Sequence, residues 1–156
     1  MRYFLDTEFN GFGGALLSLA LVPEDGEEFY VTLECEDPLV PWVERNVLPY
    51  LDTVPVGLAS PRLSRREAAD ALAAYLASDP EPELVADWPE DITHFCGLLM
   101  TGPAQIVTVP PLTFRLVPLP GFSTAANSAV PHNALHDARS LREYYSTLLE
   151  QQPFQV

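Results

Sequence analysis

The chain has 156 residues and a formal net charge of −14, because 22 acidic residues stand against 8 basic ones, all of them arginine. Apolar residues make up 47% of the sequence, which excludes an intrinsically disordered chain and suffices for one domain over residues 1–156. The negative charge excludes a protein that coats nucleic acid by neutralising many phosphates, but not an enzyme that reaches a few phosphates through metal ions. No apolar run approaches the ~20 residues of a membrane span, and an acid follows the N-terminus too soon for a signal peptide. We therefore expect a cytoplasmic protein.

Hydrophobic periodicity and turn residues predict three strands at the start of the chain, followed by helices that alternate with strands. The expected strands cover residues 2–5, 15–22, 28–34, 83–86 and 105–109. The expected helices cover residues 41–51, 67–77, 91–100 and 134–151, the second of them behind a Ser64–Glu67 capping box. The proline-rich stretch 110–131 is expected to be a long loop. This order predicts an α/β fold, in which an antiparallel meander is followed by parallel strands and helices pack on the sheet.

Asp6 and Glu8 are the first residues whose pattern points to chemistry. They follow the apolar residues Phe4 and Leu5 at the end of the first expected strand, and alternation places both on one face of an extended chain. Two carboxylates on one face repel each other unless a positive charge lies between them, and such oxygen ligands suit Mg²⁺ or Mn²⁺. A solvated acidic strand end is the alternative, because so acidic a chain is expected to contain this pair nearly once by chance.

His132 and Asp137 form a second candidate group around the start of the last expected helix. Their spacing can bring an imidazole beside a metal-bound carboxylate without making the histidine a ligand, so that His132 can act as a general base. The alternative is a helix-capping or core histidine. His136 is the competing histidine, and we expect it to face solvent or to pack locally.

Asp87 and Asp91 flank the start of the third expected helix, where the preceding strand ends. An acid at this place is stabilised by the positive end of the helix dipole, so either residue can be a helix cap and nothing more. The residues leave open which of the two takes part in a metal site.

Together the three segments resemble, in order, the three motifs of the DEDDh branch of 3′→5′ exonucleases, which have a ribonuclease H-like fold. Residues 4–9 resemble the first motif and residues 132–139 the third. The second motif of the family has an asparagine and, four residues on, the catalytic aspartate, so that Asp91 matches the aspartate and Asp87 takes the place of the asparagine. The meander and the helix at Pro41–Trp42 resemble the small bacterial exoribonuclease branch related to ribonuclease T and oligoribonuclease.

The resemblance implies a metal-dependent exonuclease that releases nucleoside 5′-monophosphates from the 3′ end of single-stranded nucleic acid, with RNA expected rather than DNA. It implies two divalent metal ions, Mg²⁺ or Mn²⁺, that together stabilise the attacking and leaving oxygens of an in-line displacement. The implied metal ligands are Asp6, Glu8, Asp91 and Asp137, and the implied general base is His132.

Substrate-binding residues are expected in the first motif and in the long loop. The candidates are Thr7 together with Phe9, Phe12 and Phe122, which offer rings for base stacking. The arginines at positions 115, 139 and 142 are candidates for bidentate contacts with phosphate. The resemblance also implies a homodimer.

Two other functions fit the same residues. The acidic charge and the altered second motif are compatible with a catalytically degenerate domain that binds a nucleotide or a partner. A metal hydrolase of free nucleotides would use the same carboxylates without a groove for a polymer.

Overall fold

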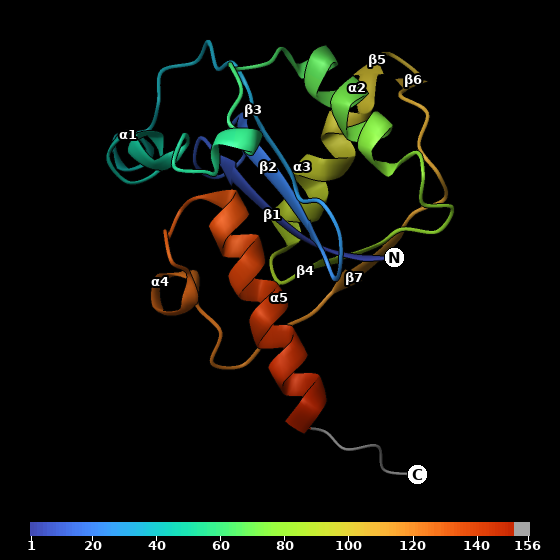
Figure 1. Cartoon of the computed structure of the whole chain (residues 1–156). Coiled ribbons are helices and arrows are strands. Elements are labelled where there is room, and N and C mark those ends of the chain that lie inside the picture. The colour runs from blue at the N-terminus through green and yellow to red at the C-terminus, as the bar shows by residue number, and fades with distance from the viewer. Residues whose placement is uncertain (152–156) are drawn as a thin grey trace.

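The computed structural model describes residues 1–151, so residues 152–156 of the predicted domain lie outside the described residues. Five strands form a mixed sheet in the order β3-β2-β1-β4-β7 (Figure 1). The strands are β1 (Arg2–Phe9), β2 (Leu16–Pro23), β3 (Phe29–Thr32), β4 (Glu83–Ala86) and β7 (Thr113–Leu116). The first three strands pair antiparallel, and β4 and β7 run parallel to β1. This arrangement confirms the predicted α/β fold.

Helices cover both faces of the sheet. The long helix α5 (Ala134–Gln151) lies against β1 and β2, and α2 (Arg65–Leu76) and α3 (Pro89–Leu99) cover the opposite face. The remaining short elements are α1 (Pro41–Asn46), η1 (Leu48–Tyr50), η2 (Val56–Leu58), α4 (Thr124–Asn127) and the hairpin of β5 (Met100–Gly102) and β6 (Gln105–Ile106). No helix among residues 1–151 is long and apolar enough to cross a membrane.

The central strand β1 supplies side chains to both cores. Tyr3 and Leu5 pack under α2 and α3, whereas Phe4 packs under α5. Burying Phe4 or Leu5 in this way contributes about 1.5–3 kcal/mol each. Because side chains alternate along a strand, Asp6 and Glu8 lie on the same face as Phe4, which is the face covered by α5. The strand therefore carries two acids directly after its apolar residues. Asp6 and Glu8 are therefore held by a central strand whose residues from Tyr3 to Glu8 are all buried.

The fold differs from the sequence-based prediction at three strands. β1 does not end at Asp6 but continues to Phe9, because its backbone stays paired with β2 through Glu8. Residues 113–116 form β7 within the expected loop; this short strand lies at the sheet edge, where flanking prolines are tolerated. Only Gln105 and Ile106 of the expected strand 105–109 form a strand, and they pair in the small β5–β6 hairpin outside the main sheet.

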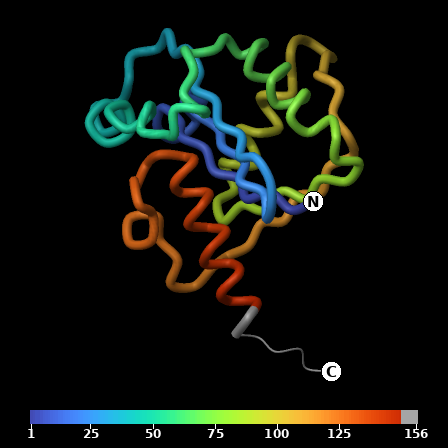
Figure 2. The backbone as a smooth tube through the Cα atoms, in the orientation of Figure 1, coloured from blue at the N-terminus to red at the C-terminus, as the bar shows by residue number. Residues whose placement is uncertain are grey.

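The expected helices are close to those observed, with one exception. The Ser64–Glu67 capping box starts α2 as predicted, and α5 has the predicted bounds. The helix expected over 41–51 ends at Asn46, and a 3₁₀ turn containing Pro49 follows, because proline has no N–H for a continuing helix. Figure 2 shows how the chain after β7 loops outward through α4 and returns to the start of α5 near α1.

Candidate functional site

A pocket of about 450 Å³ opens where β1 and β4 separate. β4 pairs with β1 only along Arg2–Phe4, so the second half of β1 has a free edge on that side. The carboxyl ends of both strands point into this gap, which is the usual position of ligand sites in open α/β sheets. The ionisable residues of its lining are Asp6, Glu8, Asp87, Asp91, His132 and Asp137. None of the described residues that line it is an arginine.

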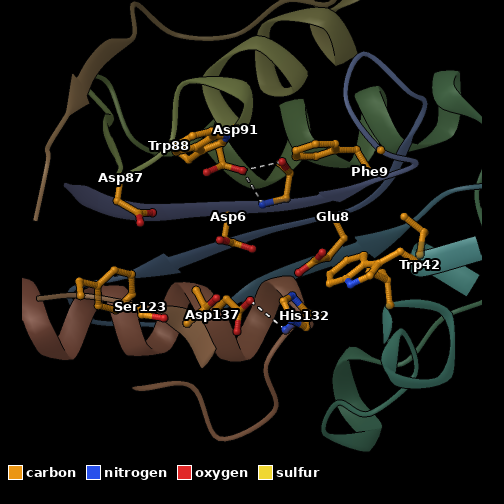
Figure 3. A pocket seen from close by; sticks show the side chains of 16 residues that line it. Asp6, Glu8, Phe9, Trp42, Asp87, Trp88, Asp91, Ser123, His132 and Asp137 are labelled. Carbon is orange, nitrogen blue, oxygen red and sulfur yellow. Dashed lines mark hydrogen bonds between the residues drawn. The ribbon is translucent and has the colours of Figure 1, made fainter. Parts of the chain in front are cut away.

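Asp6 and Glu8 enter the pocket from β1 as predicted, on one face of the strand (Figure 3). They are 8% and 9% exposed, so the solvated strand end considered above is not what the structure has. Thr7 points to the opposite side, where it holds a carboxylate of α3. The strand thus presents two acids to the pocket and a hydroxyl to the neighbouring helix.

Asp91 reaches the pocket from the first turn of α3. The backbone N–H and the hydroxyl of Thr7 both donate to Asp91 Oδ1, at 3.0 and 2.6 Å. Asp91 is 3% exposed. These bonds occupy one carboxylate oxygen and leave the other directed at the pocket (Figure 3).

Asp87 follows β4 directly and lies on the same side of the pocket. The N-cap of α3 is Trp88, and no side chain caps this helix, so neither Asp87 nor Asp91 has the capping role that the sequence left open. One carboxylate oxygen of Asp87 lies within 4.8 Å of oxygens of Asp6 and Asp91. Asp87 and Asp91 therefore both belong to the site.

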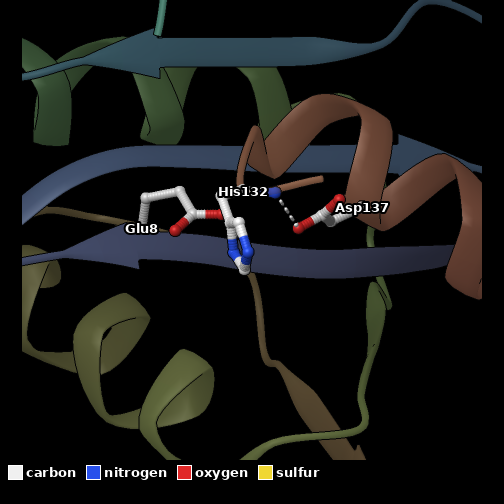
Figure 4. Close-up of side chains that lie close together, drawn as sticks. All are labelled: Glu8, His132 and Asp137. Carbon is white, nitrogen blue, oxygen red and sulfur yellow. Dashed lines mark hydrogen bonds between the residues drawn. The ribbon is translucent and has the colours of Figure 1, made fainter. Parts of the chain in front are cut away.

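Asp137 and His132 come from the start of α5. Asn133 Oδ1 accepts hydrogen bonds from the backbone N–H groups of Leu135 and His136, so Asn133 caps the helix. This cap fixes the position of Asp137 in the first turn. Asp137 Oδ2 accepts the backbone N–H of His132 at 3.1 Å (Figure 4). Ligand atoms of Glu8, His132 and Asp137 lie within 4.8 Å of one another.

The backbone of His132 lies in the left-handed region, with φ 65°. Left-handed φ is uncommon for a residue with a side chain, and here it turns the imidazole into the pocket. The Trp42 ring packs against it nearly at right angles, with centroids 4.9 Å apart. His136 instead points away, with Nε2 2.9 Å from the carbonyl oxygen of Thr53, which confirms the expected local packing.

Burial and mutual repulsion disfavour the charged form of every acid in the pocket. Burial, followed by the charges of Asp137 and Asp91, raises the pKa of Glu8 to about 9. Burial raises the pKa of Asp91 to about 7 and that of Asp137 to about 6. Burial and then the charge of Asp91 raise the pKa of Asp6 well above its ordinary value. Without a bound cation, these carboxyl groups therefore ionise less readily than exposed ones do.

The donor set fits divalent cations. Five carboxylates converge with no arginine among the described lining residues, and the buried Oδ1 atom of Asp137 has no hydrogen-bond partner. Buried carboxylates that are neither paired nor hydrogen-bonded are rare unless they coordinate a metal. Oxygen-only ligands are those that Mg²⁺ and Mn²⁺ prefer. Asp6, Asp87 and Asp91 are one group that could hold an ion, and Glu8, Asp137 and His132 are another.

Aromatic side chains form the walls of the pocket. Phe9 and Phe122 line it as expected, but Phe12 is 97% exposed on the β1–β2 turn and does not. Trp42 and Trp88 line it as well, and both are about half exposed. Sequence reasoning missed both tryptophans as pocket residues, although each lies next to a proline that opens a helix, which was the available signal.

The three arginines proposed as phosphate contacts are engaged away from the pocket. Arg139 forms a bidentate pair with Glu28, Arg115 pairs with Glu83, and Arg142 donates to the carbonyl oxygen of Pro23. None of the three lines the pocket. The acidic partners are Glu28, directly before β3, and Glu83 on β4, and both lie too far along the chain from their arginines for local sequence to reveal the pairing.

Comparison with known proteins supports a nuclease fold. No family model matches the sequence. Two 3′-5′ exoribonucleases of Mycobacterium tuberculosis, from strains CDC 1551 and H37Rv, are each 46% identical to the chain over 55 residues. That alignment spans 33% of this chain and 33% of each relative, so it covers about a third of their length.

The structural comparison extends over the whole domain. A structure of exonuclease X in complex with 5′ overhanging duplex DNA has a TM-score of 0.60 and 13% sequence identity, and the match covers 99% of this chain and 95% of that one. The likeness shows the fold, and it confirms the ribonuclease H-like sheet that the motifs predicted.

Proposed function

We propose that the protein is a divalent-metal-dependent 3′→5′ exonuclease that hydrolyses single-stranded nucleic acid, with RNA as the preferred substrate, and releases nucleoside 5′-monophosphates. The observation that carries this proposal is the convergence of Asp6, Glu8, Asp91, Asp137 and His132 in one pocket of an exonuclease-like fold. The matching segments of two exoribonucleases favour RNA. Placement in the branch of ribonuclease T and oligoribonuclease, and the homodimer, rest on motif resemblance alone.

Asp6, Glu8, Asp91 and Asp137 are the residues proposed to hold two metal ions, Mg²⁺ or Mn²⁺. Bound divalent cations supply charge stabilisation for a phosphodiester and lower the pKa of water. The protein contributes the carboxylates whose negative charge would hold the metal ions. It also contributes strand β1 and the first turns of α3 and α5, which fix the positions of those carboxylates. Thr7 holds one oxygen of Asp91, and Asn133 sets the start of α5, so the ligand positions are determined before substrate arrives.

His132 is proposed as the general base that removes a proton from the attacking water. Burial lowers the pKa of His132 below its ordinary value, so its imidazole is neutral at pH 7 and can accept a proton. The perpendicular contact with Trp42 restrains the imidazole at the pocket wall. The backbone N–H of His132, bound to Asp137, ties the base to the helix that carries a proposed metal ligand.

The half-exposed aromatic rings of the lining are proposed to stack on the terminal bases. Trp42 and Trp88 are better placed for this than Phe12, because both line the pocket and are about half exposed. Phe9 already stacks on His94 with centroids 4.5 Å apart, and Phe122 packs against Tyr144. Base–aromatic stacking is worth about 1–3 kcal/mol per base.

The test is cleavage of a 5′-labelled single-stranded RNA and of the matching DNA, with Mg²⁺, Mn²⁺ or EDTA. We expect a metal-dependent ladder that shortens from the 3′ end, with RNA cleaved faster than DNA. Asp6→Asn should abolish it, whereas Asp25→Asn, which removes an equal charge from an exposed turn, should not. Equal cleavage by Asp6→Asn and wild type contradicts the proposal, and cleavage of free nucleotides only, with intact oligomers, points to a nucleotide hydrolase instead.

A catalytically degenerate binding domain is the second candidate. The departure of the second motif, with Asp87 in the asparagine's place, and the net charge of −14 favour it. A folded chain that neither cleaves the two polymers nor binds Mn²⁺ would support this alternative, whereas Mn²⁺ binding that Asp6→Ala abolishes would contradict it.

A further inference from the structure

Asp87 is the pocket carboxylate to which the family resemblance assigns no role. It is the first residue after β4, at the carboxyl end of a strand parallel to β1, so it reaches the same sheet edge as Asp6. Figure 3 shows its carboxylate directed at the space between β1 and α5. Its nearest oxygen lies within 4.8 Å of oxygens of both Asp6 and Asp91. Ligands of one Mg²⁺ or Mn²⁺ ion, each about 2.1 Å from the metal, lie at separations of this order or shorter.

The two ordinary roles of an acid at this position do not apply to Asp87. It does not cap α3, whose N-cap is Trp88 and which has no side-chain cap hydrogen bond. The arginine–carboxylate pairs among the described residues all involve other acids. Asp87 therefore lies beside two further acids, and neither a helix cap nor an arginine pair among the described residues accounts for its carboxylate.

The carboxylate next to Asp87 is also without a partner. Asp6 is only 8% exposed. Burial and the neighbouring carboxylates raise its pKa, and no cation or hydrogen-bond donor among the described residues lowers it. Across the pocket, Asp137 Oδ1 is buried and has no hydrogen-bond partner. The buried carboxylate of Asp6 and the carboxylate of Asp137 line the same pocket as Asp87, and this set of acids without a cationic partner among the described lining residues indicates that a cation belongs there.

We propose that Asp87 is a fifth metal-ligating carboxylate, which completes a cation position with Asp6 and Asp91 beside a second position at Glu8 and Asp137. The inference rests on the proposed metal-dependent function. Three carboxylates at one position exceed the charge of a divalent ion, and affinity rises with the number of charged ligands.

The test is calorimetric titration of the full-length protein with Mn²⁺. Asp87→Asn should weaken one of two Mn²⁺ positions by about tenfold or more, since even second-shell partners of a metal ligand are worth 10–100-fold. The matched control is Glu90→Gln, which removes the same charge three residues away from a side chain that contacts Trp88 Nε1 rather than the cluster. Asp91→Asn is the positive control and should weaken the same position.

Two further outcomes decide the inference. If Asp87→Asn binds both ions as tightly as Glu90→Gln does, Asp87 is not a ligand, while wild-type Mn²⁺ binding and RNA cleavage leave the proposed function intact. If the wild-type protein binds no Mn²⁺, the proposed function fails together with the inference. Should Asp87→Asn not fold, Asp87→Glu gives the same answer: it keeps the charge but displaces the oxygens, so it weakens Mn²⁺ binding only if Asp87 is a ligand.

Discussion

Thr7 and Asp91 are joined by two hydrogen bonds to one oxygen atom: the backbone N–H of Thr7 donates at 3.0 Å and its hydroxyl at 2.6 Å, both to Asp91 Oδ1. The contact crosses from the central strand to the first turn of α3. It fixes the rotation of the carboxylate, so that Oδ2 faces the pocket. Thr7 also lines the pocket, so its predicted role in binding substrate stays a prediction beside this contact with Asp91.

Removing the Thr7 hydroxyl should therefore weaken metal binding. Thr7→Val keeps the side-chain shape and the backbone bond but leaves Asp91 Oδ1 with a single donor, and we expect Mn²⁺ affinity to fall about tenfold. Thr7→Ser retains the hydroxyl and should bind Mn²⁺ nearly as wild type does. Calorimetric titration of both variants measures this, and wild-type affinity in the valine variant would show that the backbone bond alone positions Asp91.

The metal-free protein should lose stability as the pH rises. The pKa values of Glu8, Asp91 and Asp137 are raised to about 9, 7 and 6, so the folded state binds more protons than the unfolded state does between about pH 4 and pH 9. The free energy of unfolding therefore falls across this range as the carboxylates ionise in the folded state. Thermal melting in EDTA at a series of pH values measures it, and a melting temperature that rises from pH 5 to pH 9 would contradict it.

Divalent metal should reverse that loss. A bound cation takes the place of the protons, so Mg²⁺ should raise the melting temperature more at about pH 8.5 than at about pH 5.5. In Glu8→Gln the group with the highest stated pKa no longer titrates, so the pH dependence in EDTA should be shallower. An equal Mg²⁺ effect at both pH values would show that the carboxylates are not protonated in the metal-free protein.

His132 should be separable from the metal ligands. Because its φ is 65°, asparagine is the substitution that the backbone tolerates best, and His132→Asn should lower kcat by about 10²–10⁴-fold. Mn²⁺ affinity should stay unchanged if His132 is a base, and should fall if it is a ligand with Glu8 and Asp137. His136→Asn is the control, since that ring contacts the Thr53 carbonyl outside the pocket.

Much of this site was accessible from the sequence because its parts are local. Asp6 and Glu8 share a face by strand alternation, and Asn133 to Asp137 form one helix turn, so short-range geometry predicted both groups. The pair Asp87 and Asp91 was ambiguous, because an acid that caps a helix and an acid that binds a metal look alike in sequence. The Trp88 N-cap, the grouping of Asp87 with Asp6, and the contact of Asp91 with Thr7, 84 residues away, place both acids at the pocket, and the last two of these are tertiary contacts.

The remaining features depend on long-range packing. Prolines around β7 concealed a strand whose hydrogen bonds come from β4. The arginines at 115 and 139 were assigned to phosphate because their acidic partners lie 32 and 111 residues away. Trp42 belongs to the site only because α1 and the start of α5 meet, which Asn133 secures by donating to the carbonyl oxygen of Tyr50 at 2.7 Å.

Trp88 should contribute to substrate binding rather than to chemistry. It is 57% exposed, lines the pocket, and its ring nitrogen is held by Glu90 at 2.9 Å. Trp88→Ala should raise KM by roughly 5–150-fold, the equivalent of about 1–3 kcal/mol of stacking, with a smaller change in kcat and no change in Mn²⁺ affinity. Steady-state kinetics on a short RNA measures this. A fall in kcat at constant KM would instead place Trp88 among the groups that position the metal ligands.

RNA binding should depend on metal and respond weakly to salt. Because the described pocket lining has no arginine and the protein carries a net charge of −14, bound cations would be the positive charges that a terminal phosphate meets. Fluorescence anisotropy with a short labelled RNA should show no binding in EDTA and binding in Ca²⁺, which occupies oxygen sites without necessarily supporting cleavage. Proteins that neutralise phosphates with basic side chains lose nucleic-acid affinity steeply as the salt concentration rises. In this protein, salt also screens the repulsion between the acidic surface and the RNA, which offsets part of the loss of affinity. We therefore expect a slope of log K against log salt of magnitude about 2 or less, and a steep negative slope would reveal a basic contact surface that the pocket does not contain.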